Sequence, residues 1–205
     1  MRTGLIYKSA KLYELVMLLL YGRYYSTRYR MLADLIEPRT SIVDVCCGPG
    51  ILYERYLRFK DVSYIGIDIN ERFIQRLNRM GTRSLLCDVR EATILPGADY
   101  VVIQASLYHF LPQPNRLIDQ MLCAARKYVI VAEPIHNLAT RRIPILTSLA
   151  KTLTDPGTGL QEARFTEESL DELFSHYSAE IVRSFVIPGG REKVYLLKGR
   201  SSELV

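Results

Sequence analysis

Ile42-Val43-Asp44-Val45-Cys46-Cys47-Gly48-Pro49-Gly50 is the stretch of sequence that decides the fold. An apolar run ends there in a glycine turn and a helical pattern follows, so the stretch predicts a strand, a tight loop and the start of a helix. Gly48 and Gly50 lack the Cβ atoms that would keep a ligand away from the backbone, and the amides that open the next helix carry the positive end of its dipole. We interpret the loop as a cradle for a nucleotide-like group, the alternative being an ordinary tight turn.

Two later apolar runs also end in an acid. The run from Val62 to Ile67 is followed by Asp68, and a third run ends in Cys87-Asp88-Val89. Asp68 follows Gly50 by 18 residues, which is where a nucleotide-binding α/β fold carries the acid that binds the ribose hydroxyls. We therefore expect Asp68 to bind a ribose.

These residues resemble the motifs of the class I S-adenosylmethionine-dependent methyltransferases. The family's first motif is an acid followed by Gly-x-Gly-x-Gly, and here Cys46 takes the place of the first glycine. In the second motif the matching acid, Asp68, is the ribose ligand, and in the third the matching acid, Asp88, faces the adenine amino group. The four matching segments follow the family's order: residues 43–50, 64–70, 87–89 and 98–104.

The resemblance implies a protein that binds S-adenosylmethionine, transfers its methyl group and releases S-adenosylhomocysteine. Methyl transfer from a sulfonium depends mainly on aligning the nucleophile, the methyl group and the sulfur in a partly dry pocket, so no metal is expected. The cofactor-binding residues that the resemblance implies are Asp44, Cys46, Gly48, Gly50, Asp68, Ile69, Asp88, Val89 and Gln104.

Predicted strands and helices alternate along residues 42–132, a pattern that predicts a doubly wound parallel sheet. After the first strand, the predicted strands are Val62–Ile67, Arg83–Cys87, Ala98–Gln104 and Tyr128–Ala132, and the predicted helices are Ile51–Phe59, Glu71–Met80 and Arg116–Ala125. A helix capped by Thr166 is followed by two β-rich runs, Glu180–Ile187 and Lys193–Leu197, which predict a hairpin. The expected fold class is α/β, a doubly wound, mostly parallel seven-stranded sheet with a C-terminal antiparallel hairpin and an N-terminal helical extension.

Length and composition indicate one domain. The chain has 205 residues, of which 48% are hydrophobic and 24% charged, as is ordinary for a globular α/β protein. Within residues 1–205 we expect a helical cap, 1–40, and a cofactor-binding core, 41–205, with an insertion at 134–165. The four cysteines have neither metal-ligand spacing nor a disulfide pattern, and no apolar stretch is long enough to span a bilayer. We therefore expect a cytoplasmic protein.

The N-terminal segment, residues 8–36, contains two helical patterns, Ala10–Tyr21 and Tyr25–Ile36, joined at Gly22. Residues 1–40 supply +4 of the net charge of +5, from seven Lys or Arg and three acids. Three interpretations stay open. The helices pack on the sheet edge with solvated arginines, or they form a lid that brings Tyr21 and Tyr25 to the substrate. Alternatively, they contact a membrane surface to reach a lipid-like substrate.

The residues beyond the predicted strand ends are candidates for the chemistry. Ligands of such sheets bind beyond the carboxyl ends of the strands, so we expect convergence there of Gly48, Asp68, Asp88, Gln104 and Glu133. An oxygen or carbon nucleophile would benefit from a general base, for which His109, Glu133 and His136 are the candidates. The alternatives are that His109 packs over the cofactor and that Glu133 accepts hydrogen bonds from loop amides. Tyr108 and His136 are candidate substrate contacts.

Two other functions fit the sequence less well. In a nicotinamide-dependent oxidoreductase a small residue would stand where this chain has Tyr53, and Asp44 and Asp88 would have no role. A non-catalytic binding module would not need Asp68 and Asp88. The pI of about 9.0 permits nucleic-acid binding, but no base-flipping signature or RNA-binding unit accompanies it, so a small-molecule or lipid-like acceptor is favoured. The acceptor atom, the substrate and the oligomeric state are not specified by the sequence.

Overall fold

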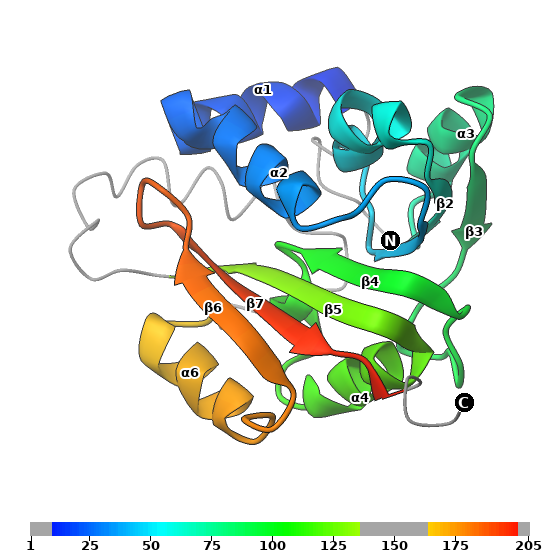
Figure 1. Cartoon of the computed structure of the whole chain (residues 1–205). Coiled ribbons are helices and arrows are strands. Elements are labelled where there is room, and N and C mark those ends of the chain that lie inside the picture. The colour runs from blue at the N-terminus through cyan, green and yellow to red at the C-terminus, as the bar shows by residue number, and fades with distance from the viewer. Residues whose placement is uncertain (1–9, 136–163, 201–205) are drawn as a thin grey trace.

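The computed structural model describes residues 10–135 and 164–200. Its central element is one seven-stranded β-sheet (Figure 1). The strand order is β3-β2-β1-β4-β5-β7-β6. Strands β1 to β5 are parallel, whereas β7 is antiparallel to both β5 and β6. The strands are β1 Ser41–Val45, β2 Ser63–Asp68, β3 Arg83–Leu86, β4 Ala98–Gln104, β5 Ala125–Pro134, β6 Ile181–Val186 and β7 Glu192–Lys198. The predicted fold class is confirmed.

The helices also follow the predicted alternation. The α-helices are α1 Ala10–Tyr21, α2 Tyr25–Asp34, α3 Glu71–Arg79, α4 Asn115–Ala124 and α6 Glu167–Ser175, and the short helical segments are η2 Gly22–Tyr24, η3 Tyr53–Leu57, η4 Arg58–Lys60 and η5 Leu107–Phe110. Asn70 caps α3 by accepting from the Arg72 amide at 3.0 Å, and Thr166 caps α6 by accepting from the Ser169 amide at 3.1 Å. The N-cap predicted at Thr166 is confirmed. None of the helices in the described ranges has the length and hydrophobicity to cross a membrane.

The predicted crossover helix over residues 51–59 is irregular. Its middle, η3, is a π-helix and its end, η4, is a 3₁₀ helix. Tyr53 packs on Tyr64 with ring centres 4.6 Å apart, and Tyr56 stacks on Tyr29 at 6.0 Å. Large aromatic side chains therefore anchor this segment to the sheet and to α2, which the helical periodicity alone does not indicate.

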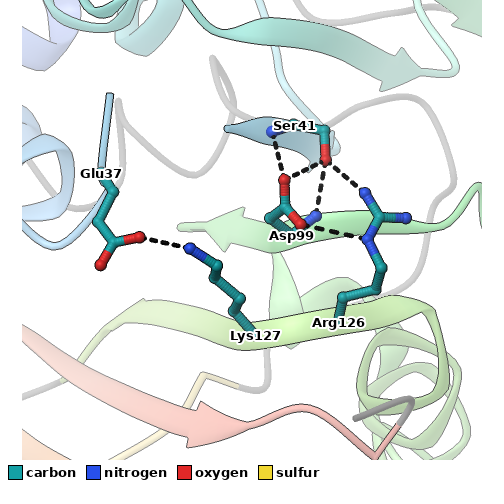
Figure 2. A network of polar contacts seen from close by, with 5 residues as sticks. All are labelled: Glu37, Ser41, Asp99, Arg126 and Lys127. Atoms are coloured by element: carbon teal, nitrogen blue, oxygen red, sulfur yellow. Dashed lines mark hydrogen bonds and ion pairs between the residues drawn. The ribbon is translucent and has the colours of Figure 1, made fainter. Parts of the chain in front are cut away.

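Strand β5 is longer at both ends than the predicted strand over residues 128–132. Its polar start is held by charges from neighbouring elements (Figure 2). Lys127 donates to Glu37 at 2.5 Å, and Arg126 binds both Asp99, at 3.2 Å, and the Ser41 hydroxyl, at 2.7 Å. The Ser41 amide donates to Asp99 at 2.8 Å. This network joins the amino ends of β1, β4 and β5, and a search for apolar runs does not detect it.

Helices cover both faces of the sheet. Helices α2 and α3 pack on one face, with Leu32 and Leu77 in that core, and α4 and α6 pack on the other, with Ile118 and Phe174 in the second core. Side chains alternate between these cores along each strand. Strand β5 shows the alternation: Ile130 and Ala132 face α2, whereas Val129 and Val131 face α4. The same alternation determines on which face the polar residues at the strand ends lie.

Helix α2 belongs to the core. Its Tyr25, Tyr29 and Leu32 are buried together with Ile42 and Ile130 of the sheet, so the helix packs on a face of the sheet and not on an edge. The interpretation of an edge-packed pair with solvated arginines is wrong for α2, because Arg28 is only 1% exposed. The predicted insertion, 134–165, lies outside the described residues except at its two ends.

Candidate cofactor and substrate site

The glycine loop follows β1 with three residues in the left-handed backbone region. The φ angles are 55° at Cys46, 55° at Gly48 and 76° at Gly50, values that residues with a Cβ atom adopt at a cost. A Cβ atom at Gly50 would lie 2.5 Å from Leu77 Cδ2, whereas at Gly48 it would meet nothing within 4 Å. Gly50 is therefore required for packing against α3, and Gly48 leaves open space beside the loop.

Cys46 is the departure from the methyltransferase motif. Its left-handed conformation explains why glycine suits this position, since the conformation costs about 1–2 kcal/mol for other residues. Burial raises the pKa of its thiol well above the usual value, and the nearby Asp68 and Asp44 raise it further. Cys46 is therefore a neutral thiol at physiological pH.

Asp68, at the end of β2, holds the loop in place. The side chain is nearly buried, with Oδ2 accepting from the Gly48 amide at 2.8 Å and Oδ1 from the Asn70 amide at 2.8 Å. Burial raises the pKa of this carboxyl, while the hydrogen bonds from Asn70 and Gly48 oppose that rise. The predicted ribose ligand thus also fixes the loop and the start of α3.

Asp44, in β1, lies below the loop on the α2 face of the sheet. The Tyr64 hydroxyl donates to its Oδ2 at 2.7 Å. Burial raises the pKa of Asp44 to about 7, helped by the nearby Asp68 and opposed by the bond from Tyr64. Asp44 is one of the residues that line a small cavity beside the loop: Arg28, Tyr29, Asp44, Cys46, Cys47, Gly48, Pro49, Ile51, Leu52 and Gln104.

Arg28 closes this cavity from α2. Its Nε donates to Glu192 Oε2 at 2.7 Å and its Nη2 to Oε1 at 3.2 Å, and Gln104 Nε2 donates to the same Oε1 at 3.0 Å. The rings of Tyr21 and Tyr29 lie 4.1 and 5.1 Å from the guanidinium. Burial lowers the pKa of Arg28, but the charge and hydrogen bond of Glu192, together with Tyr21 and Tyr29, outweigh burial and hold the pKa above its usual value. The ion pair connects α2, β4 and β7.

Sequence reasoning did not identify Arg28 or Glu192. Helical spacing could have indicated Arg28, because it follows Tyr25 by three residues and precedes Leu32 by four, within the buried stripe of α2. A charged residue in such a stripe indicates a buried partner. Glu192 begins a β-rich run and carries no comparable signal.

Glu133 lies on the other face of the sheet, because it alternates with Ala132 along β5. Its Oε2 accepts from the Leu107 amide at 2.9 Å, as the structural alternative expected. Its Oε1 has no hydrogen-bond partner among residues 10–135 and 164–200. Burial raises the pKa of Glu133 to about 8, although the bond from Leu107 opposes the rise. Glu133 and Gln104 therefore end neighbouring strands on opposite faces of the sheet.

Tyr108 and His109 lie in η5, directly after β4. Their ring centres are 3.9 Å apart, and the Arg164 guanidinium lies 3.3 Å from the centre of the Tyr108 ring. Burial raises the pKa of Tyr108 to about 12, while Arg164 opposes that rise. Arg164 stands within the predicted insertion and was not identified from the sequence. His136 lies outside the described residues.

The remaining predicted cofactor residues lie around the ends of β2 and β3. Asp88 accepts from Arg90 Nη2 at 2.7 Å and from the Arg90 amide at 3.0 Å, and these bonds hold the pKa of Asp88 below its usual value. Val89 is buried, whereas Ile69 is 53% exposed beside Asp68. The exposed Ile69 offers apolar surface next to the predicted ribose site.

The two tyrosines predicted to contact the substrate differ in position. Tyr21 stacks on Arg28, which lines the cavity. Tyr25 is buried and packs edge-on against Tyr29, with ring centres 5.4 Å apart. Tyr29, and not Tyr25, lines the cavity. The role of either tyrosine in substrate binding stays a prediction.

Solved structures share this fold at low sequence identity. One is a chain from the complex between the Haloferax volcanii Trm112 methyltransferase activator and a protein assigned as a methyltransferase, with TM-score 0.70, 10% identity, and coverage of 97% of this chain and 99% of that one. Another is the magnesium protoporphyrin IX methyltransferase ChlM from Synechocystis PCC 6803 with bound SAH, with TM-score 0.60, 13% identity, and coverage of 91% and 83%. A third is the cyclopropane synthase MmaA2 from Mycobacterium tuberculosis, with TM-score 0.61, 13% identity, and coverage of 81% and 64%.

The fold and the loop geometry define the class: the chain has the fold of the class I S-adenosylmethionine-dependent methyltransferases, as the motifs predicted. A family model described as methionine biosynthesis protein MetW matches residues 26–156, more than half of the chain. The chain belongs to the MetW family. No curated protein matches it in sequence.

Proposed function

We propose that this MetW-family protein binds S-adenosylmethionine in the cytoplasm and transfers its methyl group to a small-molecule or lipid-like acceptor. The observation that carries the proposal is the loop itself. Asp68 holds the Gly48 amide at 2.8 Å, and the cavity beside the loop is lined by both a cation, Arg28, and an acid, Asp44. The bound SAH of ChlM, which has the same fold, supports the choice of cofactor.

The donor set of the cavity suits the amino-acid end of the cofactor. An α-amino acid group carries one ammonium and one carboxylate. Asp44 would bind the ammonium, and Arg28, which already pairs with Glu192, would bind the carboxylate through its remaining donors. Asp68 would bind the ribose, and Ile69, Asp88 and Val89 would surround the adenine. When bound, the sulfonium supplies an electrophilic methyl group. The protein's part is to fix the cofactor and limit its contact with water, and the buried Arg28 and Tyr29 form part of the cavity wall.

The acceptor site is proposed beyond β4 and β5. Tyr108 would form its wall, with Tyr21, Tyr25 and His136 as further candidate contacts. Two candidate bases, His109 and Glu133, lie in the described residues. One carboxylate oxygen of Glu133 already accepts a hydrogen bond from the Leu107 amide, which favours a role for Glu133 in positioning. His109, partly exposed beside Tyr108, is then the better candidate to take a proton from a neutral nucleophile.

Calorimetry with S-adenosylhomocysteine and with NAD tests the proposal. We expect the first ligand to bind and the second not to bind, because Tyr53 stands where a dinucleotide fingerprint needs a small residue. Preferential binding of NAD, or no binding of S-adenosylhomocysteine by the folded chain, would overturn it.

A second candidate role is peripheral membrane contact through residues 8–36. Helix α1 exposes Leu15, Leu18 and Leu19, at 53%, 48% and 66%, and their spacing places them on one helix face. An apolar face in a basic segment is typical of helices that lie in a membrane interface. We expect co-sedimentation with anionic vesicles that fades at high salt and is lost when the three leucines are replaced by serine. Equal sedimentation of both variants would contradict this role.

A further inference from the structure

Arg164 is a partly buried cation next to Tyr108. Its guanidinium lies 3.3 Å from the centre of the buried Tyr108 ring. None of the ion pairs within residues 10–135 and 164–200 includes Arg164, although their other arginines at comparable burial pair with acids. A guanidinium stacked on an aromatic ring uses its face for the stacking. One edge donor of Arg164 is hydrogen-bonded to Tyr108, and no acid in the described residues forms an ion pair with the remaining donors. Arg164 can therefore bind an anion through those donors.

A second unsatisfied group points to the same place. Glu133 is 1% exposed, and its Oε1 has no hydrogen-bond partner in the described part of the chain. Glu133 and Arg164 interact electrostatically, and both act on the Tyr108 hydroxyl. A buried polar atom without a partner costs about 1–3 kcal/mol, so a ligand that satisfies Oε1 is favoured there.

This cluster borders the glycine loop. Cys46 lines the cofactor cavity and also acts electrostatically on Tyr108. Cys46 and Tyr108 contribute to the same core on the α4 face. The Arg164 cluster and the cofactor cavity are thus on opposite faces of the sheet at its carboxyl edge, with Cys46 between them. A ligand held by Arg164 would lie next to the loop that binds the cofactor.

We propose that Arg164 binds the carboxylate of the methyl acceptor, with Glu133 Oε1 as a second polar contact, so that the acceptor is an organic acid. The inference rests on the proposed function, since it assigns the acceptor of that reaction. One guanidinium balances one carboxylate and matches its planar, two-oxygen geometry. A phosphate dianion fits less well because the acids Asp44, Asp68 and Asp88 already surround the loop.

The state of Glu133 supports a carboxylate neighbour. Burial raises its pKa to about 8, so that at neutral pH the group is mostly protonated. Oε2 accepts from the Leu107 amide, and Oε1 has no partner in the described residues. A proton carried on Oε1 can therefore be donated to a ligand oxygen. The charged and titratable groups that act on Glu133 are Glu192, on the opposite face of the sheet, and Arg164 and Tyr108, on its own face.

The test measures carboxylate preference in the full chain saturated with S-adenosylhomocysteine. The probes are linear and aromatic monocarboxylates, each with its primary amide, and inorganic phosphate, followed by ligand-detected NMR and calorimetry. We expect at least one acid to bind about tenfold or more tightly than its amide. Arg164→Gln should abolish that preference, and Arg164→Lys should restore part of it because the charge returns without the planar fork.

Arg183→Gln is the matched control, because Arg183 also stacks on an aromatic ring, that of Phe185, at 4.8 Å, but on β6. It should leave the preference unchanged.

The inference is overturned if acids and amides bind the wild type alike, if Arg164→Gln keeps the preference, or if phosphate binds better than every acid in an Arg164-dependent way. Normal S-adenosylhomocysteine binding with no acid preference overturns this inference alone, whereas loss of that binding in the wild type contradicts the proposed function. The melting temperature of Arg164→Gln verifies its folding.

Discussion

At the residue scale, Asp68 both holds the loop and offers acceptors to a ligand. Its two oxygens accept from the amides of Gly48 and Asn70, and each oxygen keeps a further lone pair for a ligand. We predict that Asp68→Ala weakens S-adenosylhomocysteine binding by about 1–3 kcal/mol, measured by calorimetry. Asp119→Ala is the control, because Asp119 binds Arg200 at 2.9 Å on α4 and should have no effect. An unchanged dissociation constant in a folded Asp68→Ala variant would refute the ribose role.

Asp44 and Glu133 are buried carboxyl groups whose pKa values in the folded protein, about 7 and about 8, lie above their ordinary values. Burial is the main cause in both cases. The folded state therefore binds these protons more tightly than the unfolded state does. The stability that they contribute is complete below about pH 4 and is lost as the pH rises through their folded-state pKa values.

Glu133→Gln tests this pH dependence. Glutamine still offers an acceptor to the Leu107 amide but cannot ionise. We predict that the free energy of unfolding of the variant, relative to the wild type, is larger at about pH 9 than at about pH 5, by on the order of 1–3 kcal/mol. Urea unfolding at both pH values measures the difference, and the same pH dependence in variant and wild type would contradict the prediction.

Asp99 provides the control of opposite sign. Partial burial would raise its pKa, but hydrogen bonds from Ser41 and Arg126 outweigh burial and hold the pKa below its usual value (Figure 2). Its contribution to stability is therefore present above about pH 4 and is lost only as the pH falls through the folded-state value. Asp99→Asn should change stability equally at about pH 5 and about pH 9.

At the scale of elements, the buried pair Arg28–Glu192 ties α2 to β7. Removing one partner leaves the other charge buried without compensation, so we predict that Arg28→Met lowers the free energy of unfolding by about 3–5 kcal/mol. The double variant with Glu192→Gln should recover part of this loss. Urea unfolding of the single and double variants measures the coupling.

Lys127–Glu37 is the matched pair for comparison, because both of its side chains are largely exposed, at 44% and 60% (Figure 2). Lys127→Met should change the free energy of unfolding far less than Arg28→Met does, because solvent screens the exposed pair. A loss for Arg28→Met no greater than that for Lys127→Met would show that the buried pair does not fasten α2 to the sheet.

At the scale of the whole molecule, α2 and α3 cover one face of the sheet and α1 lies outside α2 (Figure 1). Since α2 is part of the core, we predict that its amides exchange slowly with or without ligand. If the N-terminal segment closes over the cofactor, the amides of α1 and of the glycine loop should slow when S-adenosylhomocysteine is added, while those of α4 stay unchanged. Exchange in α1 that is insensitive to the ligand would exclude a lid.

Much of the cofactor half of the site could be predicted from the sequence. The glycine loop, Asp44 and Asp68 lie within one strand-loop-helix unit and the strand that follows it, where local periodicity and turn chemistry determine the structure. The alternation of strands and helices then admits few sheet topologies, because such connections are right-handed and short. For this reason the sequence by itself determined the fold class and the position of the glycine loop at the carboxyl edge of the sheet.

Only the tertiary structure decided which distant residues complete the site. Glu192 stands 164 positions from Arg28, and the two meet because β7 inserts beside β5 and α2 packs across that face. Arg164 reaches Tyr108 across the other face. Glu133 does not line the cavity that Gln104 lines, since a shift of one residue along a strand turns a side chain to the opposite face. Local sequence patterns do not determine the order of the strands or the face of the sheet on which the last side chains of each strand lie. Both follow from how the two cores pack.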